Sequence, residues 1–200
     1  MQLRTQLHTQ KGFTLIEIAI VLTIVGLIIG GIWLAASTVF TNNKARALSA
    51  DAIQVIQNTK TLFGGQGAQA SATGMTVSLA YTSGIFPADM MAGTAAAPHV
   101  ITPFNTDPTV DGFDIPAATA TTLQFQFGKG AQGLPSNACT QLLTTLGGSQ
   151  NIQKLGITQL MGGATDVTPA AGASLSAATA AASCVAVGNT NTVSVTFSVI

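Results

Sequence analysis

"KGFTLIEIAIVLTIVGLIIGGIWLAASTVF", residues 11–40, is the most informative stretch of this sequence. From Phe13 to Phe40 it forms a predominantly apolar run whose single charge is Glu17. A helix of this length rises about 42 Å at roughly 1.5 Å per residue, whereas the hydrocarbon core of a bilayer is about 30 Å thick. The run therefore predicts a helix that is long enough to span a membrane.

The start of the chain does not follow the order of an ordinary secretory signal. Residues 1–12 are polar and carry Arg4 and Lys11, but no short apolar stretch with a small-residue cleavage site follows them. Lys44 and Arg46 lie beyond the run, so it has two basic residues on each side. The count of basic residues therefore does not predict which end of the helix faces the cytoplasm. We expect the short basic start on the cytoplasmic side, because a disulfide in the later region would require that region to be exported.

Glu17 is the only glutamate in the 200 residues, and it lies where a carboxylate is costly. A charge at the centre of a membrane helix costs about 2.5–3.5 kcal/mol on insertion scales, so Glu17 either extends to the headgroups or needs a partner. The apolar run contains no Lys or Arg. Cleavage between Gly12 and Phe13 would create a positively charged amino terminus in the apolar layer. The Glu17 carboxylate and this amino terminus would neutralise each other most naturally between neighbouring molecules whose helices are staggered.

The sequence KGFTLIE, residues 11–17, ahead of a long apolar helix resembles the class III signal of type IV prepilins and related pseudopilins. In that family a membrane aspartyl peptidase cuts after the glycine and methylates the new amino terminus, and the glutamate guides docking into a growing filament. The resemblance implies a leader peptide at residues 1–12, cleavage between Gly12 and Phe13, N-methylation of Phe13, and Glu17 as the assembly carboxylate.

The same resemblance implies where the chain resides and what it contacts. Its partners would be other copies of the chain in a helical filament, the prepilin peptidase, and the pilus assembly platform of the inner membrane. The precursor would lie in the inner membrane, and the assembled subunit would form an extracellular pilus, or fimbrium, on the bacterial surface. No cofactor is expected.

A second pattern continues beyond the apolar run. Apolar or small residues recur at spacings of three and four, which is the stripe of an amphipathic helix. The stripe consists of Ala45, Leu48, Ala52, Val55, Ile56, Thr59 and Phe63. We expect it to pack against a globular head.

We predict one helix over residues 14–63, because no proline interrupts it and Gly64-Gly65 follows it. The alternative is two helices that are broken near residues 41–43. Gly26 and Gly30 form a G-x-x-x-G pair, which indicates close packing of helices. The alternative is local melting of the helix on assembly, as happens in parts of the pilin helix in the family, because glycine weakens a helix interior by about 0.5–1 kcal/mol relative to alanine.

The later region shows short strand signals. TTLQFQF, residues 121–127, and TVSVTFSVI, residues 192–200, alternate apolar and polar side chains with period two, which predicts half-buried antiparallel strands. SCVAVGNTNTVSVTF, residues 183–197, predicts a hairpin with Val185 and Val187 on its first strand. The expected fold class is α+β, with a long amino-terminal helix and an antiparallel sheet as in the pilin fold.

The two cysteines both lie in this later region. Cys139 belongs to NACTQLLTTLGG, residues 137–148, where Leu142, Leu143 and Leu146 follow at helical spacing. No C-x-x-C motif supports a zinc site. If the region is exported, Cys139 and Cys184 are expected to form one disulfide worth about 3–4 kcal/mol, and the alternative is two buried thiols. The disulfide would join this helix to a strand at Cys184.

One cysteine opens a C-x-x-L-L helix, and the second precedes a terminal strand. This arrangement resembles that of type IVb pilins more than that of type IVa pilins. The leader departs from this pattern, since type IVb leaders are usually longer than twelve residues and often are not followed by phenylalanine. The expected organisation is a cleaved leader at 1–12, a long helix at 13–63 and a head at 64–200. Within the helix, residues 13–40 form the membrane or filament-core part and residues 41–63 form the amphipathic part.

Other candidate sites are weak. Asp107, Asp111 and Asp114 could bind calcium as in some pseudopilin heads, but their spacing is not that of an EF-hand, and Asp before Pro or Gly is ordinary turn chemistry. His99 lies between Pro98 and Val100 with no assignable partner, which indicates a turn or edge histidine. No metal site is therefore predicted. Only 7% of residues are charged and the basic ones are scattered, so no nucleic-acid site is evident.

No catalytic motif is present, and we expect no enzyme. The leading hypothesis is a structural subunit, the major pilin, of a type IV pilus that serves adhesion, motility, or DNA or conjugative transfer. The alternatives are a pseudopilin of a type II secretion system and a minor pilin that acts as a tip adhesin. A signal-anchored periplasmic enzyme is the remaining class, and it would retain residues 1–12.

Overall fold

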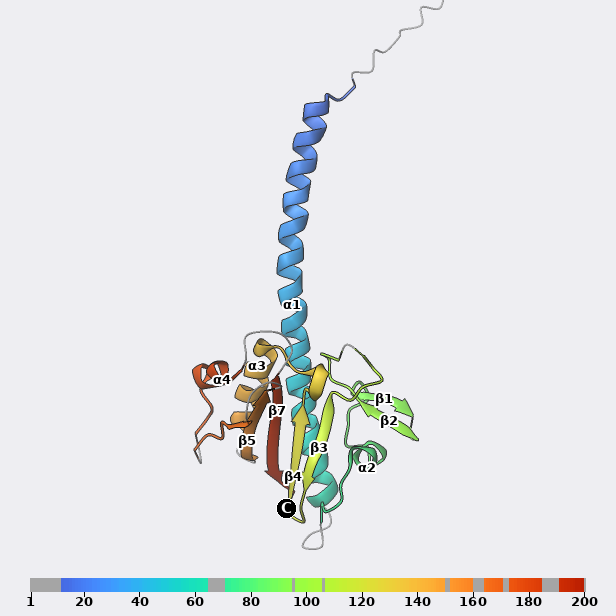
Figure 1. The fold of residues 1–200 in the computed structure, drawn as a ribbon, viewed down its shortest axis with the longest axis vertical. Coiled ribbons are helices and arrows are strands. Elements are labelled where there is room, and N and C mark those ends of the chain that lie inside the picture. Colours follow the sequence, from blue (N-terminus) through green and yellow to red (C-terminus); the bar gives the residue numbers. More distant parts are fainter. Residues whose placement is uncertain are drawn as a thin grey trace, which may run out of the picture. The chain divides into compact units, whose positions relative to one another are not determined.

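The computed structural model describes residues 12–64, 71–94, 96–105, 107–149, 152–159, 164–170, 173–184 and 191–199. The chain divides into two compact units, Met1–Phe40 and Thr41–Ile200. Figure 1 shows that α1, Leu15–Gly64, runs through both of them as one helix. The prediction of a single helix is confirmed, and the break considered near residues 41–43 is absent.

The second half of α1 belongs to the second unit and supplies part of its core. All seven residues of the predicted stripe are buried there, and Leu48, Ala52, Val55 and Thr59 have no exposed surface. The hydroxyl of Thr59 donates to the carbonyl oxygen of Val55 at 2.6 Å, so its polar atom is satisfied within the helix. Burying this stripe, rather than intrinsic helix propensity, therefore stabilises this part of α1.

The main sheet of the second unit has five antiparallel strands in the order β3-β4-β7-β5-β6. The strands are β3 Phe113–Ala118, β4 Thr122–Phe127, β5 Ile152–Gln159, β6 Ala164–Asp166 and β7 Asn191–Ser198. The two strands predicted from period-two patterns, β4 and β7, are confirmed, and they are direct neighbours with Phe125 opposite Val195. The last strand thus occupies the centre of the sheet, and the α+β class is confirmed.

The sheet buries a cluster of aromatic rings. Phe113, Phe125, Phe127 and Phe197 are completely buried, and Phe125 and Phe127 occupy the buried positions of the alternating strand β4. Phe125 contacts Phe113 and Phe197 edge-to-face, with ring centroids 5.1 and 4.9 Å apart. Such pairs contribute about 0.5–1.5 kcal/mol each beyond the area that they bury. They fix the register of the three strands to which they belong.

Short helices and a small hairpin lie at the two sides of this sheet (Figure 1). The helix α3, Ser136–Gly147, packs on β5 and β7, and α4, Ala177–Ser183, packs on α3. The helix α2, Val77–Thr82, packs on the two-stranded sheet of β1, Met91–Thr94, and β2, Ala97–Val100. A 3-10 turn, Gly130–Gln132, follows β4.

The helix predicted around Cys139 is confirmed as α3, since Leu142, Leu143 and Leu146 are buried on one face of it. The strand predicted at Cys184 is wrong, because that residue caps the carboxyl end of α4. The physical reason is the alanine-rich sequence before it, which favours a helix, and Ser176, whose hydroxyl accepts from the Thr179 amide as an N-cap. The predicted strand at Val185 and Val187 lies outside the described residues.

Candidate assembly site

The amino end of the described chain is an exposed turn that leads into α1. Gly12, Phe13 and Thr14 precede the helix, and the Thr14 carbonyl accepts the amides of Glu17 at 3.1 Å and Ile18 at 3.3 Å. The Phe13 side chain is 78% exposed. The peptide bond between Gly12 and Phe13 therefore lies outside regular secondary structure.

Glu17 lies in the first turn of α1 and is exposed. A negative charge at this place is favoured by the unpaired amides and the dipole of the helix amino terminus. Residues 12–40 contain no Lys, Arg or His, so this segment offers Glu17 no cationic side chain. If the chain began at Phe13, its amino group would be the one positive charge in the apolar unit.

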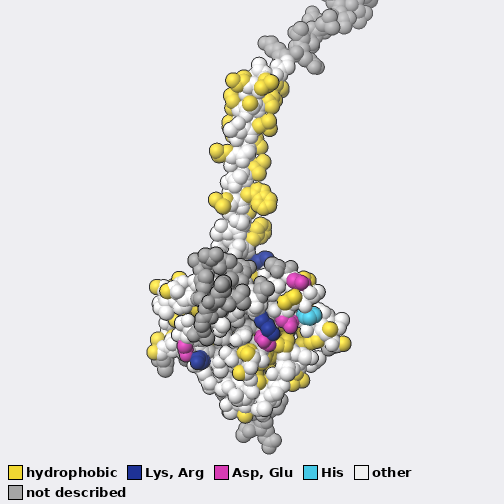
Figure 2. All heavy atoms as spheres, viewed as in Figure 1, with side chains coloured by type: hydrophobic (Ala, Val, Ile, Leu, Met, Phe, Trp, Pro, Cys, Tyr) yellow, Lys and Arg dark blue, Asp and Glu magenta, His cyan; other side chains and the backbone are white. Residues whose placement is uncertain are grey.

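The rest of residues 13–40 is predominantly apolar on every side of the helix. Its exposed side chains include Leu15, Ile16, Val21, Leu22, Leu27, Trp33, Leu34 and Phe40. At about 100° per residue these positions surround the helix axis instead of forming one stripe. Figure 2 shows hydrophobic side chains along the visible length of this segment. The most hydrophobic part of the helix has a mean hydropathy of 2.7, and no part of it is buried against the rest of the chain. The helix is long and apolar enough to cross a membrane.

The glycines of this segment do not break the helix. α1 continues through Gly26, Gly30 and Gly31, and a Cβ atom at any of them would meet no atom within 4 Å apart from the adjoining backbone of the helix itself. The structure thus shows no contact inside the chain that requires these glycines. Their small size leaves a low surface on the helix that another molecule can approach closely.

This amino-terminal arrangement is that of a known signal, because residues 7–33 match the family described as the prokaryotic N-terminal methylation motif. The chain carries a prepilin-type signal. Followed by the long apolar helix, this signal supports a type IV pilin-like or pseudopilin precursor, and it implies processing by a prepilin peptidase. A pilin-type signal indicates a structural protein. The chain matches no curated protein and no solved structure.

The three aspartates considered for calcium each have partners from the chain. Asp107 accepts from the Thr109 amide and hydroxyl, which holds the pKa of its carboxyl below the usual range. Asp111 accepts from the Val100 amide at 3.0 Å, and Asp114 lies 2.8 Å from the Lys129 ammonium. Among the described residues no three His, Cys, Asp or Glu side chains form a group that could hold a metal ion. The loop is therefore built by these hydrogen bonds.

His99 has a neighbour that the sequence did not reveal. Its Nδ1 lies 3.4 Å from Asp111 Oδ1 across the β2 edge, so the expectation that it has no assignable partner is wrong. The β1-β2 pairing and the bond from Val100 to Asp111 bring the two together, although twelve positions in the sequence make the contact hard to anticipate. Its position on a strand of the two-stranded sheet agrees with an edge histidine.

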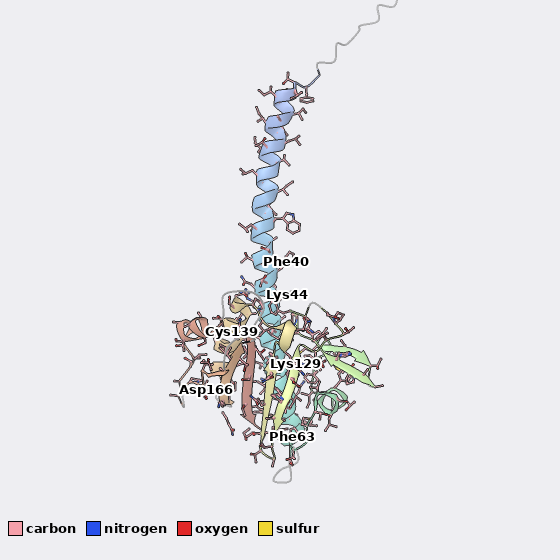
Figure 3. The ribbon with its side chains drawn as sticks, in the orientation of Figure 1. Phe40, Lys44, Phe63, Lys129, Cys139 and Asp166 are labelled. Carbon is pink, nitrogen blue, oxygen red and sulfur yellow. A yellow bond between two sulfur atoms is a disulfide. The ribbon has the colours of Figure 1, made fainter. Side chains whose placement is uncertain are left out.

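The two cysteines form a disulfide, Cys139–Cys184, across a sequence separation of 45 residues. Figure 3 places Cys139 on α3. Cys139 is completely buried and Cys184 is 7% exposed, so the bond lies inside the packing of α3 and α4. It fixes α4 to the helix that covers β5 and β7, and no free cysteine remains among the described residues.

Asp51 is a buried acid that the sequence pattern does not indicate. It lies on the part of α1 that packs into the second unit, it is 7% exposed, and its Oδ2 has no hydrogen-bond partner. Burial, and secondarily the carboxylate of Asp89, raise the pKa of Asp51 to about 6. The only sequence signal was an acid next to the apolar stripe, between Leu48 and Ala52.

The raised pKa of Asp51 predicts a specific dependence of stability on pH. The folded state keeps a proton that the unfolded state releases, so this contribution is complete below the unfolded pKa near 3.8 and is lost as the pH rises through about 6. Asp51→Asn should therefore stabilise the full chain in detergent at pH 7.5, on the order of 1 kcal/mol, and make no difference at pH 4. Denaturant unfolding at both pH values measures this. A difference that is equal at the two pH values would contradict the assignment.

Proposed function

We propose that this chain is the major structural subunit of an extracellular type IV pilus. The observation that carries the proposal is a methylation signal directly followed by a helix that is apolar on every side and uncovered by its own chain. Such a helix needs an apolar environment, first the bilayer and then the matching helices of other copies. Assembly into a filament supplies the second environment outside the membrane.

In this proposal the residues at the amino end have separate roles. Cleavage after Gly12 removes the polar leader and exposes the amino group of Phe13, which is then N-methylated. Glu17 lies one helical turn from that amino group. In a staggered neighbour the carboxylate and the amino group neutralise each other in the apolar interior, where either charge alone is expensive. Addition of a copy to the growing filament is therefore favoured when it supplies the charge that neutralises the amino group or carboxylate of its neighbour.

The second unit would form the outside of the filament. Its core is closed by the central strand β7 and by the Cys139–Cys184 disulfide, which suits a protein exposed outside the cell. The disulfide, and the protein partners of Asp107, Asp111 and Asp114, favour a pilin over a calcium-binding pseudopilin. Adhesion, motility, and DNA or conjugative transfer are the roles that such a filament would serve.

Labelling of sheared surface filaments with an antibody against residues 41–200 tests this assignment. A major pilin should be labelled along the whole length of the filaments. Label only at filament tips would indicate a minor adhesin, and label only in the envelope would indicate a pseudopilin. Either of these results would overturn the proposal that the chain is the major subunit.

A further inference from the structure

Two basic side chains closely follow the apolar run, and neither pairs with an acid in the described part of the chain. Lys44 and Arg46 are both exposed on α1 and form no ion pair among the described residues. Lys129 and Lys154, by contrast, each pair with an aspartate. Residues 13–59 contain no other Lys or Arg. We call Lys44 and Arg46 the basic collar, and its charge is available to a group outside the chain.

The basic collar lies at the level where a bilayer carries its phosphates. Lys44 and Arg46 come four and six residues after Phe40 in the same helix, and Figure 3 labels Phe40 and Lys44 on it. They therefore lie about 6 and 9 Å beyond the end of the apolar run. The headgroup layer on each side of the hydrocarbon core is about 5–7 Å thick. Side chains on a helix lean towards its amino end, so both cations extend back into this layer.

The two cations lie on opposite sides of α1. They are two residues apart, which is about 200° around a helix. A folded partner would contact one side of the helix, whereas lipid headgroups reach every side that the second unit does not cover. Phosphate oxygens accept charge-assisted hydrogen bonds from both lysine and arginine. Anionic phospholipids therefore fit the basic collar better than an acidic protein surface does.

We infer that Lys44 and Arg46 bind the phosphates of anionic phospholipids at the outer surface of the membrane before assembly, and thereby set the depth of α1 in the bilayer. The run from Phe13 to Phe40 rises about 42 Å, about 12 Å more than the hydrocarbon core is thick. When the phosphates hold its carboxyl end, the excess of about eight residues falls at the other end. Glu17 is one of these residues, so its carboxylate reaches the headgroups of the opposite surface.

This contact gives Glu17 a suitable environment before assembly as well as after it. In the membrane its carboxylate lies at the aqueous boundary, where a charge costs less than in the hydrocarbon core. Assembly then releases Lys44 and Arg46 from their lipids. The inference goes beyond the proposed function, because a minor pilin or a pseudopilin precursor would be held in the same way. Its failure would therefore leave the assignment as major subunit standing, and the reverse also holds.

Trp33 makes the lipid contact measurable, because it is the only tryptophan of the chain and its side chain is 74% exposed. The full chain is placed in vesicles of equal parts phosphatidylglycerol and phosphatidylcholine. Bromine, which quenches tryptophan fluorescence, is carried on the acyl chains of one lipid or of the other. Acyl chains of lipids bound at the basic collar run past Trp33, so the anionic lipid should associate with the wild-type chain about fivefold more strongly than phosphatidylcholine.

Neutral variants test whether the basic collar causes this preference. Lys44→Gln with Arg46→Gln should remove it, so that both brominated lipids quench equally. Arg4→Gln with Lys11→Gln is the matched control, because it removes the same charge at the other end of the run, and it should keep the preference within about twofold of wild type. An intact disulfide verifies folding of each variant.

Two results would overturn the inference. Equal quenching by both lipids in the wild-type chain would favour an acidic surface of another copy as the partner of the basic collar. A preference for the anionic lipid that survives in the chain with Lys44→Gln and Arg46→Gln would place the lipid contact elsewhere.

Discussion

Glu17→Ala is expected to leave processing and membrane insertion intact and to abolish incorporation of the chain into filaments beside wild-type copies. The alanine makes the helix more apolar, so insertion into the bilayer improves. The methylated amino group of a neighbour, however, would be left without a counter-charge in an apolar interior. Such a charge costs about 3 kcal/mol, so incorporation should fall by about a hundredfold.

To measure this effect, the tagged variant and the untagged wild-type chain are produced in the same cells. The ratio of variant to wild type in the sheared fraction is then divided by the same ratio in the membrane. Thr23→Ala is the matched control. Thr23 is the next exposed polar side chain along the helix, and its hydroxyl already donates to the Ala19 carbonyl at 2.8 Å. Removing it should change incorporation little. Normal filament yield from Glu17→Ala alone would exclude the proposed role of Glu17.

Removal of the disulfide is expected to have the largest effect on stability. Replacing Cys139 and Cys184 by serine opens a loop across 45 residues, which in the chain-entropy model costs about 4 kcal/mol of unfolding free energy. The two serines would also place hydroxyls in the buried contact of α3 and α4. The variant should be degraded in the cell envelope and absent from filaments.

Denaturant unfolding of the full chain in detergent measures this loss. Thr140→Ala is a suitable control, because its hydroxyl bonds only within α3, to the Ser136 carbonyl at 2.8 Å. It should change the free energy of unfolding by less than about 1 kcal/mol. An unfolding free energy of the double serine variant within 1 kcal/mol of wild type would show that the packing of α3 and α4 holds the domain without the bond.

The parts of the fold that the sequence predicted are those with strong local periodicity. The apolar run and the stripe from Ala45 to Phe63 required one helix, and the alternation in β4 and β7 required strands. The leucines of α3 recur at helical spacing in the same way. In the stripe, in β4 and β7, and in α3 the side chains that repeat are the ones that the structure buries, whereas the side chains of the apolar run are exposed.

The parts that were missed have weak or contradictory local signals. β3 contains a proline and shifts register between Asp114 and Ala117, and β5 contains Gly156, where a Cβ would approach Ser194 Oγ to 2.9 Å. The sequence Ala177–Ser183 has no apolar stripe, so α4 was not recognised. The order of the sheet, with β7 at its centre, depends on pairings between residues far apart in the chain.

The candidate site shows the same division. Gly12, Phe13 and Glu17 lie within one short stretch of sequence, so this signal can be recognised without a structure. The buried carboxylate of Asp51 cannot, because Asp89, which acts on it electrostatically, lies 38 positions away in the sequence. A buried carboxylate without a partner is a property of the folded chain, and Asp51 in the sequence resembles any solvated acid on a helix.

The mass of the protein sheared from the cell surface, measured intact and on its amino-terminal peptide without reducing agent, tests the central claim most directly. The proposed function predicts a chain that begins at N-methylated Phe13 and is two hydrogens lighter than the reduced chain, because of the Cys139–Cys184 bond. A chain that still begins at Met1, or the absence of the protein from the sheared fraction, would contradict a processed pilus subunit.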